Sequence, residues 1–159
     1  MDVDQRLIDL GVELPEPFPA FGTFVSSVQT GSLVFTSGHV PHDADGVVTG
    51  RLGEDLTVDD GYRAAGLAAR SLLATLRRDL GDLDRVVRIV SLLGTVNAAP
   101  SFVEHTAVVD GASDLLVQVF GDAGRHARLA VGVSSLPANL ALEIQSVIEV
   151  SGHPADGSA

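Results

Sequence analysis

Two runs with the composition of β-strands close the chain within residues 125–150, and they restrict its fold more than any other segment. Side chains alternate between the two faces of a strand. In the first run, large apolar residues alternate with Arg128, Ala130 and Gly132; in the second, mostly apolar residues alternate with a set that includes Gln145. Paired as a hairpin, the runs would present one apolar core face and one face that carries a guanidinium beside small neighbours.

Arg128 is therefore the first candidate for a functional residue. Small residues at positions 130 and 132 would leave space beside its side chain, and a guanidinium matches a carboxylate through two parallel hydrogen bonds. We predict a receptor for a small carboxylate. The alternative is a structural ion pair with Glu143 or Glu149 across the hairpin.

Composition excludes several kinds of chemistry. The chain has 159 residues, which fits one domain, and its net charge of -11 argues against a nucleic-acid partner. All ten basic residues are Arg, so there is no lysine to form a Schiff base. The absence of Cys excludes disulfides, thiolate nucleophiles and Cys-ligated metals. His39 and His42 lack accompanying carboxylates of ligand spacing and are interpreted as surface histidines rather than metal ligands.

No apolar run approaches the roughly 20 residues of a membrane span. The N-terminus has early acidic residues and no apolar core of a signal peptide. We therefore expect a soluble cytoplasmic protein without a membrane partner.

The remaining elements follow from apolar periodicity and from Gly and Pro positions. In chain order they are a helix within residues 1–14, an arm with three prolines, strands at 24–29 and 33–37, a surface loop at 42–55, a helix at 57–80, a strand at 86–96, a helix that starts near residue 100, and the two closing strands. This β-β-α-β-α-β-β order predicts an α+β domain with two helices on one face of a mixed sheet of about five strands. The expected divisions are the helix and arm at 1–22, the main domain at 23–150 and a flexible tail at 151–159.

Several local signals sharpen this prediction. Thr57 and Asp60 form a capping-box-like pattern, and Gly81 favours the end of that helix. Gly111 predicts a kink or break in the second helix. The apolar run at 86–96 predicts a central strand that is buried on both faces. Because a sheet face that mixes Arg128 with apolar residues is poorly suited to water, we expect a homo-oligomer with the site near its seam.

Four segments resemble the signatures of the RidA/YjgF family of reactive-intermediate deaminases, also described as endoribonuclease L-PSP-like. They are FTSGHVP at residues 35–41, HARLAVGVSSLP at 126–137, LEIQSVIEV at 142–150, and PAFGTFVSSVQTG, which resembles the opening strand. Their order and spacing match the family across most of residues 19–150. The longer N-terminal arm is similar to a branch with an extended N-terminus.

This resemblance implies a chorismate-mutase-like fold assembled as a homotrimer, with three clefts between subunits. It implies hydrolysis of small enamine or imine acids to 2-keto acids and ammonia without a cofactor or a metal, as in 2-iminobutanoate/2-iminopropanoate deaminases. Arg128 would grip the substrate carboxylate with help from the backbone N–H of Ala130. Ser37 and Gly38 would line the pocket beside the reacting carbon.

Three positions depart from the pattern of active members. Phe24 stands where they often have Tyr, Asp110 lies near where an Asn is common, and Gln145 stands where many have the Glu that orients the attacking water. Gln can hold a water but cannot accept its proton, and losing a general base costs a factor of about 10² to 10⁴. Two hypotheses stay open: a weakened hydrolase in which Gln145 positions water, and a non-catalytic trimeric module that binds a small carboxylate metabolite or a partner enzyme. Ribonuclease activity is disfavoured by the acidic, lysine-free composition.

Overall fold

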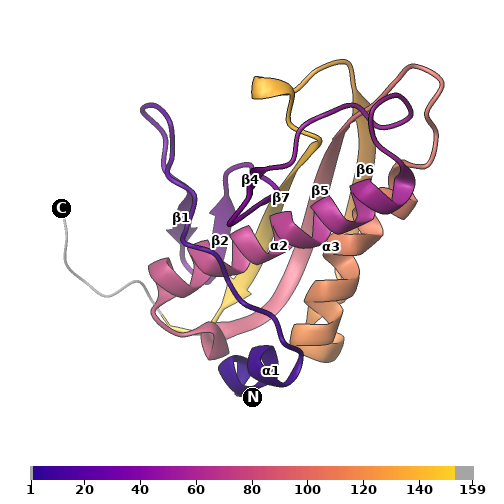
Figure 1. The fold of residues 1–159 in the computed structure, drawn as a ribbon. Helices are drawn as coiled ribbons and strands as arrows, with labels where there is room; N and C mark the ends of the chain where they lie inside the picture. Colours follow the sequence, from indigo (N-terminus) through magenta and orange to yellow (C-terminus); the bar gives the residue numbers. More distant parts are fainter. Residues whose placement is uncertain (1, 153–159) are drawn as a thin grey trace.

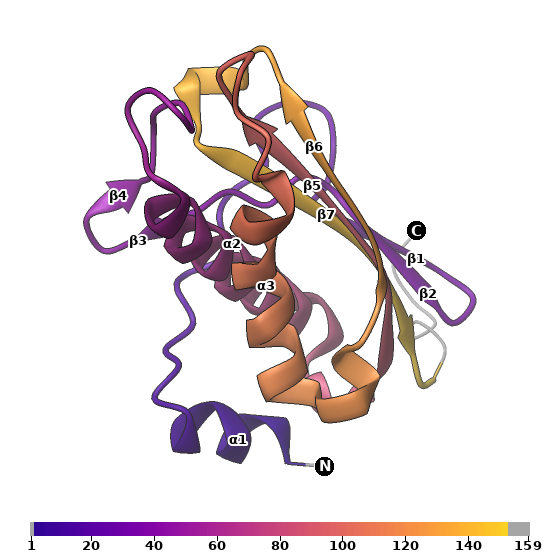
Figure 2. The same ribbon diagram turned by 90° about the vertical axis from the view of Figure 1, so that its right-hand side faces the viewer.

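A mixed sheet of five strands forms the centre of the structure, and two long helices cover one of its faces (Figures 1 and 2). The structure is a computed structural model that describes residues 2–152. In order across the sheet, the strands are β1 (Ser27–Thr30), β2 (Leu33–Thr36), β7 (Leu142–Val150), β5 (Val86–Asn97) and β6 (Ala127–Val133). The helices are α1 (Val3–Asp9), α2 (Val58–Leu80) and α3 (His105–Phe120). The predicted α+β class, with one mixed sheet and two helices on one face, is confirmed.

Short elements connect these parts. They are β3 (His42–Asp43), β4 (Gly46–Val47), and the 3-10 turns η1 (Leu83–Arg85), η2 (Gly121–Gly124) and η3 (Pro137–Asn139). The β3–β4 hairpin falls within the segment that the sequence predicted as a surface loop. Of the predicted tail, only Ser151 and Gly152 belong to the described residues. Among residues 2–152, no helix has the length and apolar character needed to cross a bilayer.

The predicted closing hairpin is wrong, because β6 and β7 are not neighbours. β6 pairs in parallel with β5 at the edge of the sheet, whereas β7 lies between β2 and β5 and is antiparallel to both. A parallel pair needs a crossover connection, which α3 provides, and the chain then passes over the end of β5 through η3. The central strand is therefore β7. β5 is not buried on both faces in the single chain, since Val87 and Val90 are 48% and 37% exposed.

The sheet register also reverses the predicted orientation of β6. Arg128 lies beside Leu92, which lies beside Ser146 on β7. Leu92 and Ser146 are buried beneath the helices. Arg128 therefore faces α3, whereas Leu129 lies on the open face of the sheet and is 59% exposed.

Close packing of α3 explains the small residues on this side of β6. A Cβ atom at Gly132 would overlap the His105 side chain on α3, and Ala130 packs against the core. The space that the sequence placed beside Arg128 is therefore occupied by the helix rather than open. A small residue on a strand marks close approach of another element as readily as it marks a cavity.

Helix α2 follows its sequence signals. The Thr57 side chain accepts a hydrogen bond from the Asp60 N–H and the Asp60 carboxylate accepts one from the Thr57 N–H, which completes the capping box. Gly81 ends the helix in the left-handed conformation, with φ of 78°. The buried stripe toward the sheet includes Ala65, Ala69, Leu72, Leu73 and Leu76.

The two covering helices cross at a pair of glycines, and the predicted break at Gly111 is wrong. α3 runs without interruption through this position. A Cβ atom at Gly111 would overlap the carbonyl oxygen of Tyr62 on α2, whereas one at Gly66 would meet its nearest neighbour, the Gly111 oxygen, at 3.7 Å. Gly111 therefore permits close helix packing rather than bending.

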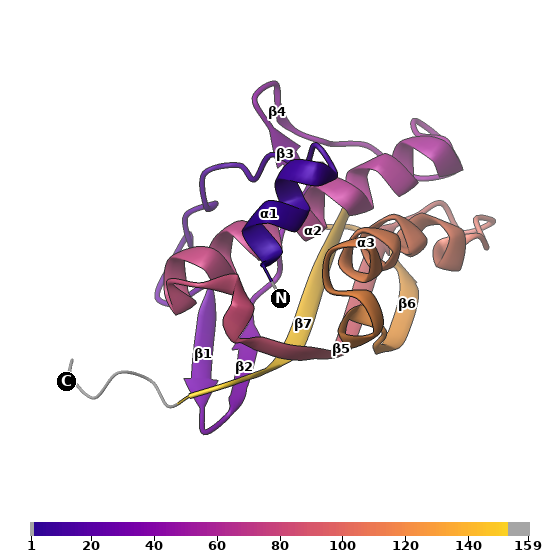
Figure 3. The same cartoon turned by 90° about the horizontal axis from the view of Figure 1, so that it is seen from below.

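The N-terminal segment consists of α1 and an arm without regular structure that reaches β1 (Figures 1 and 3). α1 buries Val3 and Leu7 in the main core, and its Asp4 forms an ion pair with Arg77 of α2. The start of the arm is thus fixed to the helical layer. Its middle part approaches β3, because the Phe18 and His42 rings lie 4.9 Å apart between centroids.

Candidate active site

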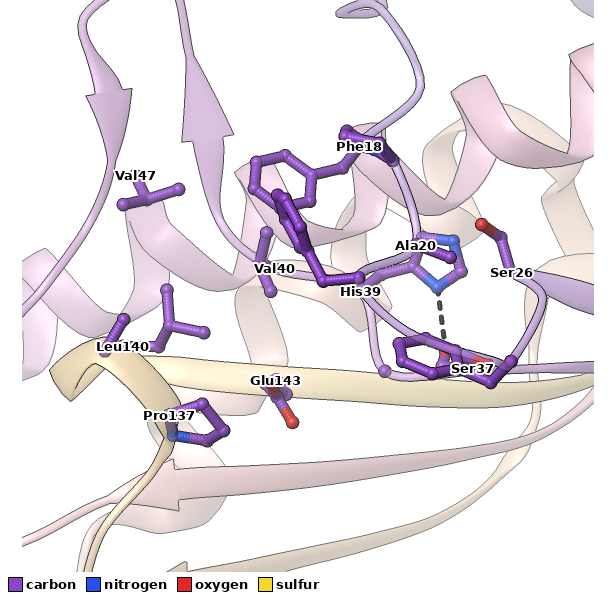
Figure 4. A pocket seen from close by; sticks show the side chains of 15 residues that line it. Phe18, Ala20, Ser26, Ser37, His39, Val40, Val47, Pro137, Leu140 and Glu143 are labelled. Carbon is purple, nitrogen blue, oxygen red and sulfur yellow. Dashed lines mark hydrogen bonds between the residues drawn. The ribbon is translucent and has the colours of Figure 1, made fainter.

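A cavity of about 360 Å³ lies where the end of β2 approaches β7 (Figure 4). Three separate segments form its walls: the N-terminal arm, the segment after β2, and the η3–β7 region. Most of the lining is apolar: Phe18, Pro19, Ala20, Phe21, Phe24, Val40, Val47, Pro137, Ala138 and Leu140. The polar side chains are those of Ser26, Ser37, His39 and Glu143. Size and composition both fit a pocket for a small organic molecule, for which about 300–1,000 Å³ is usual.

Glu143 is the chemically distinctive residue of this cavity. It is the second residue of β7 and lies beside Thr95 of β5. Its side chain has no hydrogen bond or ion pair with any other described residue, and burial raises the pKa of its carboxyl above the ordinary value. An unpaired, partly buried carboxylate is costly for a fold, so such groups are candidates for function.

Gly38 allows the carboxylate to approach the chain that follows β2. A Cβ atom at this position would lie 3.1 Å from the Glu143 Oε2 atom, closer than an ordinary contact. The next residue, His39, exchanges two backbone hydrogen bonds with Ile144 on β7, at 2.7 and 3.0 Å. This bridge fixes Gly38 beside Glu143.

The His39 side chain is buried and neutral, which corrects its interpretation as a surface histidine. Its Nδ1–H donates to the Ser37 carbonyl (2.9 Å, dashed in Figure 4), so its Nε2 accepts from the Thr75 hydroxyl of α2 (2.9 Å). Burial lowers the pKa of His39 to about 4. The ring links the end of β2 to α2 and thereby supports the Gly38 loop. Its role is positional, because both ring nitrogens are engaged.

Ser37 also serves to hold the chain in place. Its hydroxyl donates to the Val25 carbonyl at 2.6 Å, and its N–H donates to the Ser26 carbonyl at 2.9 Å. These bonds connect the end of β2 to the segment before β1. Since its proton is committed to a carbonyl, the hydroxyl acts as a pocket wall and hydrogen-bond acceptor rather than as a nucleophile.

A smaller hollow of about 250 Å³ continues from this site along the open face of the sheet. Ser37, Gly38 and Glu143 border both spaces, and the smaller one extends to Gln145 and Thr95. The structure thus brings together four of the residues predicted from the sequence: Phe24, Ser37, Gly38 and Gln145. It adds Glu143, which the sequence interpretation assigned only a possible ion pair.

Arg128 and Ala130 lie elsewhere. Arg128 and Gln145 both border a shallow depression over β5, but the register directs their side chains to opposite faces of the sheet. The Arg128 side chain is 18% exposed; it pairs with Asp110 of α3 at 2.7 Å and donates to the Ser113 hydroxyl at 3.0 Å. The structural alternative named the wrong partners, since the ion pair joins Arg128 to α3 and not to Glu143 or Glu149.

A hydrogen-bond chain extends the Arg128 cluster. The Nδ1–H of His126 donates to the Gly124 carbonyl at 2.6 Å, so its Nε2 accepts from the Ser113 hydroxyl at 3.0 Å. Burial lowers the pKa of His126, which favours this neutral form.

The described residues contain no group of three or more His, Asp or Glu side chains that could hold a metal ion.

The sequence could have pointed to Glu143 through strand alternation alone, which puts it on the same face as Gln145. The missing information was the long-range bridge between His39 and Ile144, which connects residues far apart in the chain and decides which of the two side chains lies against Gly38.

Comparison with known proteins gives concordant matches. Residues 4–149 match the profile of a family described as "YjgF/chorismate_mutase-like, putative endoribonuclease". "Protein TCP17" of Trypanosoma cruzi is 44% identical over 151 residues, which cover 94% of each chain. A crystal structure of a "putative endoribonuclease" from Shewanella oneidensis is 36% identical with a TM-score of 0.91, over 94% of this chain and 100% of that one. Atu1372 of Agrobacterium tumefaciens, described as having unknown function, is 39% identical with a TM-score of 0.87 over 94% of both chains.

Proposed function

Because the chain belongs to the YjgF/chorismate mutase-like family, as its motifs indicated, we propose that it hydrolyses enamine or imine acids to 2-keto acids and ammonia without a cofactor. The observation that carries this proposal is the unpaired carboxylate of Glu143 beside Gly38. In this proposal the Glu143 carboxylate is the general base, a role that the Gln145 amide cannot take. A raised carboxyl pKa brings the basicity of Glu143 nearer to neutral pH, which favours proton transfer.

The proposed reaction needs one base and one water. Water adds to the carbon of the protonated imine while Glu143 accepts a proton from it, which gives a carbinolamine. The carboxylic acid then returns the proton to nitrogen, and the C–N bond breaks with release of ammonia. The proton of the remaining hydroxyl passes to this ammonia, so that a 2-keto acid and ammonium leave. The Gln145 amide, two residues along the same face, can hold the water by hydrogen bonds.

The substrate carboxylate needs a separate anchor. Within one chain, Arg128 cannot reach a ligand at Glu143, because the sheet separates the two side chains. The proposal therefore includes the homotrimer implied by the sequence resemblance, in which Arg128 of one copy and Glu143 of another would face one cleft. The exposed apolar residues Phe35 and Leu129 on the open face of the sheet support such an assembly, being 44% and 59% exposed.

A coupled assay tests the catalytic role. An amino-acid dehydratase generates the imine, and keto-acid release is followed with and without this protein. Glu143→Gln should lower the enzymatic rate by a factor of about 10² to 10⁴. Glu149→Gln is the matched control, because Glu149 lies on the same strand and the same face but outside both hollows. Equal activity of wild type and Glu143→Gln would refute the role of Glu143.

A second candidate function is a non-catalytic module that binds a small carboxylate metabolite. It is favoured by Gln145 and Phe24, which lack the proton acceptor and the hydroxyl that active members often carry at these positions. Calorimetry with 2-keto acids discriminates between the two: binding without turnover supports the module, and turnover supports the hydrolase.

A further inference from the structure

The N-terminal arm turns the candidate site into a pocket with an aromatic wall. The arm contributes Phe18, Phe21 and Phe24 to the cavity lining. Phe18 and Phe21 pack edge to face with centroids 5.5 Å apart, and Phe18 also packs against His42. The first of these rings is thereby held against the body of the domain. In the single chain, Phe21 and Phe24 remain 71% and 54% exposed.

Aromatic rings that remain in contact with water cost the folded chain free energy. Aromatic residues gathered at the mouth of a cavity mark a binding surface more often than a structural one. The prolines at positions 15, 17 and 19 restrict the arm to extended conformations, so the rings are presented at a low cost in conformational entropy.

The charges of the cavity narrow the choice of ligand. Glu143 is the only formally charged residue among the described lining, because His39 is neutral above its pKa of about 4. A carboxylate placed inside the cavity would meet the Glu143 charge without a compensating cation. A protonated nitrogen beside Glu143 is favoured instead, with the apolar part of the ligand against the rings.

The cavity is too large for the smallest imine substrates to fill. A methyl or ethyl substituent would leave most of the roughly 360 Å³ unoccupied, and the aromatic rings would stay in contact with water. A phenyl or branched aliphatic substituent would cover them. Each buried methylene contributes about 0.8 kcal/mol of transfer free energy, so the difference between these substituents is large.

We propose that this cavity selects imines whose carbon carries a large apolar substituent, aryl or branched aliphatic, with the imine nitrogen at Glu143 and the substituent against Phe18, Phe21 and Phe24. The inference rests on the proposed hydrolase function and names its substrate class. The arm is then the specificity-determining element, and the substrate carboxylate points out of the cavity.

Turnover of a graded substrate series tests this selectivity. An amino-acid oxidase with excess catalase generates 2-imino acids from alanine, leucine and phenylalanine, and their loss is followed by competition with semicarbazide. We expect the catalysed rate constant for the phenylalanine-derived imine to exceed that for the alanine-derived imine by at least about tenfold, in line with pocket discrimination. The double substitution Phe21→Ala/Phe24→Ala should remove most of this preference. Both rings are exposed, so the substitutions leave the core intact.

Val103→Ala is the matched control, since Val103 is an exposed apolar residue (80%) between β5 and α3, outside the cavity. It should keep the wild-type preference. Turnover with equal or better use of the alanine-derived imine would overturn the selectivity while leaving the hydrolase function intact. A preference that survives the double substitution would overturn the role of the arm.

Binding measurements distinguish a failure of this inference from a failure of the catalytic proposal. If no imine is turned over, the hydrolase proposal fails, and calorimetry with 2-phenylethylamine, ethylamine and phenylacetate decides the ligand class. Tighter binding of 2-phenylethylamine than of the other two, weakened at least about tenfold by the double substitution, supports the pocket assignment. Absence of 2-phenylethylamine binding would overturn the pocket assignment. This is also the result expected if a second copy of the chain fills the cavity.

Discussion

Glu143 is kept partly buried without a partner among the described residues, so the folded protein is destabilised by its charge. Its folded-state pKa lies above the value of 4.5 expected for an unperturbed side chain. The native state therefore favours the protonated form, and this contribution to stability is present at low pH and lost as the pH rises through the folded-state pKa. Functional groups often retain such a cost because activity requires it.

A first prediction follows for stability. Glu143→Gln should raise the thermal unfolding midpoint at pH 7 by a few degrees, because a neutral amide replaces a poorly solvated charge. The gain should fade at pH 4, where the wild-type carboxyl is protonated. Calorimetric melting at both pH values measures this, and a variant that is less stable than wild type at pH 7 would contradict the assignment.

His39 gives a second prediction, with the opposite sign of pKa shift. Its pKa falls from 6.5 to about 4 on folding, so its contribution to stability is present above pH 6.5 and is lost as the pH falls toward 4. A shift of this size corresponds to about 3 kcal/mol at most. Urea denaturation should therefore show a steeper loss of stability between pH 6.5 and 4.5 in wild type than in His39→Gln. Parallel pH profiles of the two proteins would show that His39 titrates normally.

Ser37 and Gly38 were assigned to a substrate pocket by the resemblance of their segment to a family motif. Both line the candidate cavity, although the neighbour that gives Gly38 its position there, Glu143, is distant in the chain. Arg128 was assigned to the wrong sheet face, because strand alternation separates two sets of side chains but does not tell which set faces the core. That choice depends on α3, a contact between distant parts of the chain.

The packing of α2 against α3 makes an element-scale prediction with a built-in control. Gly111→Ala should destabilise the fold by about 1–3 kcal/mol or more, because the added methyl would overlap the Tyr62 carbonyl. Gly66→Ala, at the same crossing, has room and should stabilise α2 by up to about 1 kcal/mol. Chemical denaturation of both variants measures the difference; similar effects at the two positions would contradict the predicted asymmetry.

Element boundaries were predictable where the sequence carries its own start and stop signals. The capping box at Thr57 and the glycine at 81 bound α2 as expected, and the strand at 86–96 ends within one residue of β5. Strand pairing was not predictable from these signals. The sequence of β6 resembles the first strand of a hairpin. In the structure, however, β6 pairs in parallel with the apolar strand β5.

At the scale of the whole molecule, the open face of the sheet carries exposed apolar side chains that a single chain leaves in contact with water. They include Val28, Phe35, Leu129 and the partly exposed Val131 and Val147. In three of these strands the apolar positions lie side by side, since Val28 pairs with Phe35 and Phe35 with Val147. Self-association through this face would bury them.

A prediction about assembly follows. Sedimentation equilibrium should give three times the chain mass of 16.5 kDa, and Leu129→Asp should shift the protein toward the monomer, because the charge would be buried at the seam. Val103→Asp, at an exposed position between β5 and α3, should leave the mass unchanged. A wild-type mass of a single chain would contradict the expected homotrimer and the cleft that depends on it.

The pH dependence of kcat/KM for imine hydrolysis, corrected for the uncatalysed reaction, tests the role of Glu143 most directly. The wild-type profile should fall on the acid side with an apparent pKa above the ordinary glutamate range, as protonation removes the base. In Glu143→Gln this limb should be absent and the remaining rate low at every pH, whereas Glu149→Gln should keep the wild-type profile. An acid limb that persists unchanged in Glu143→Gln would contradict the assignment of this carboxylate as the catalytic base.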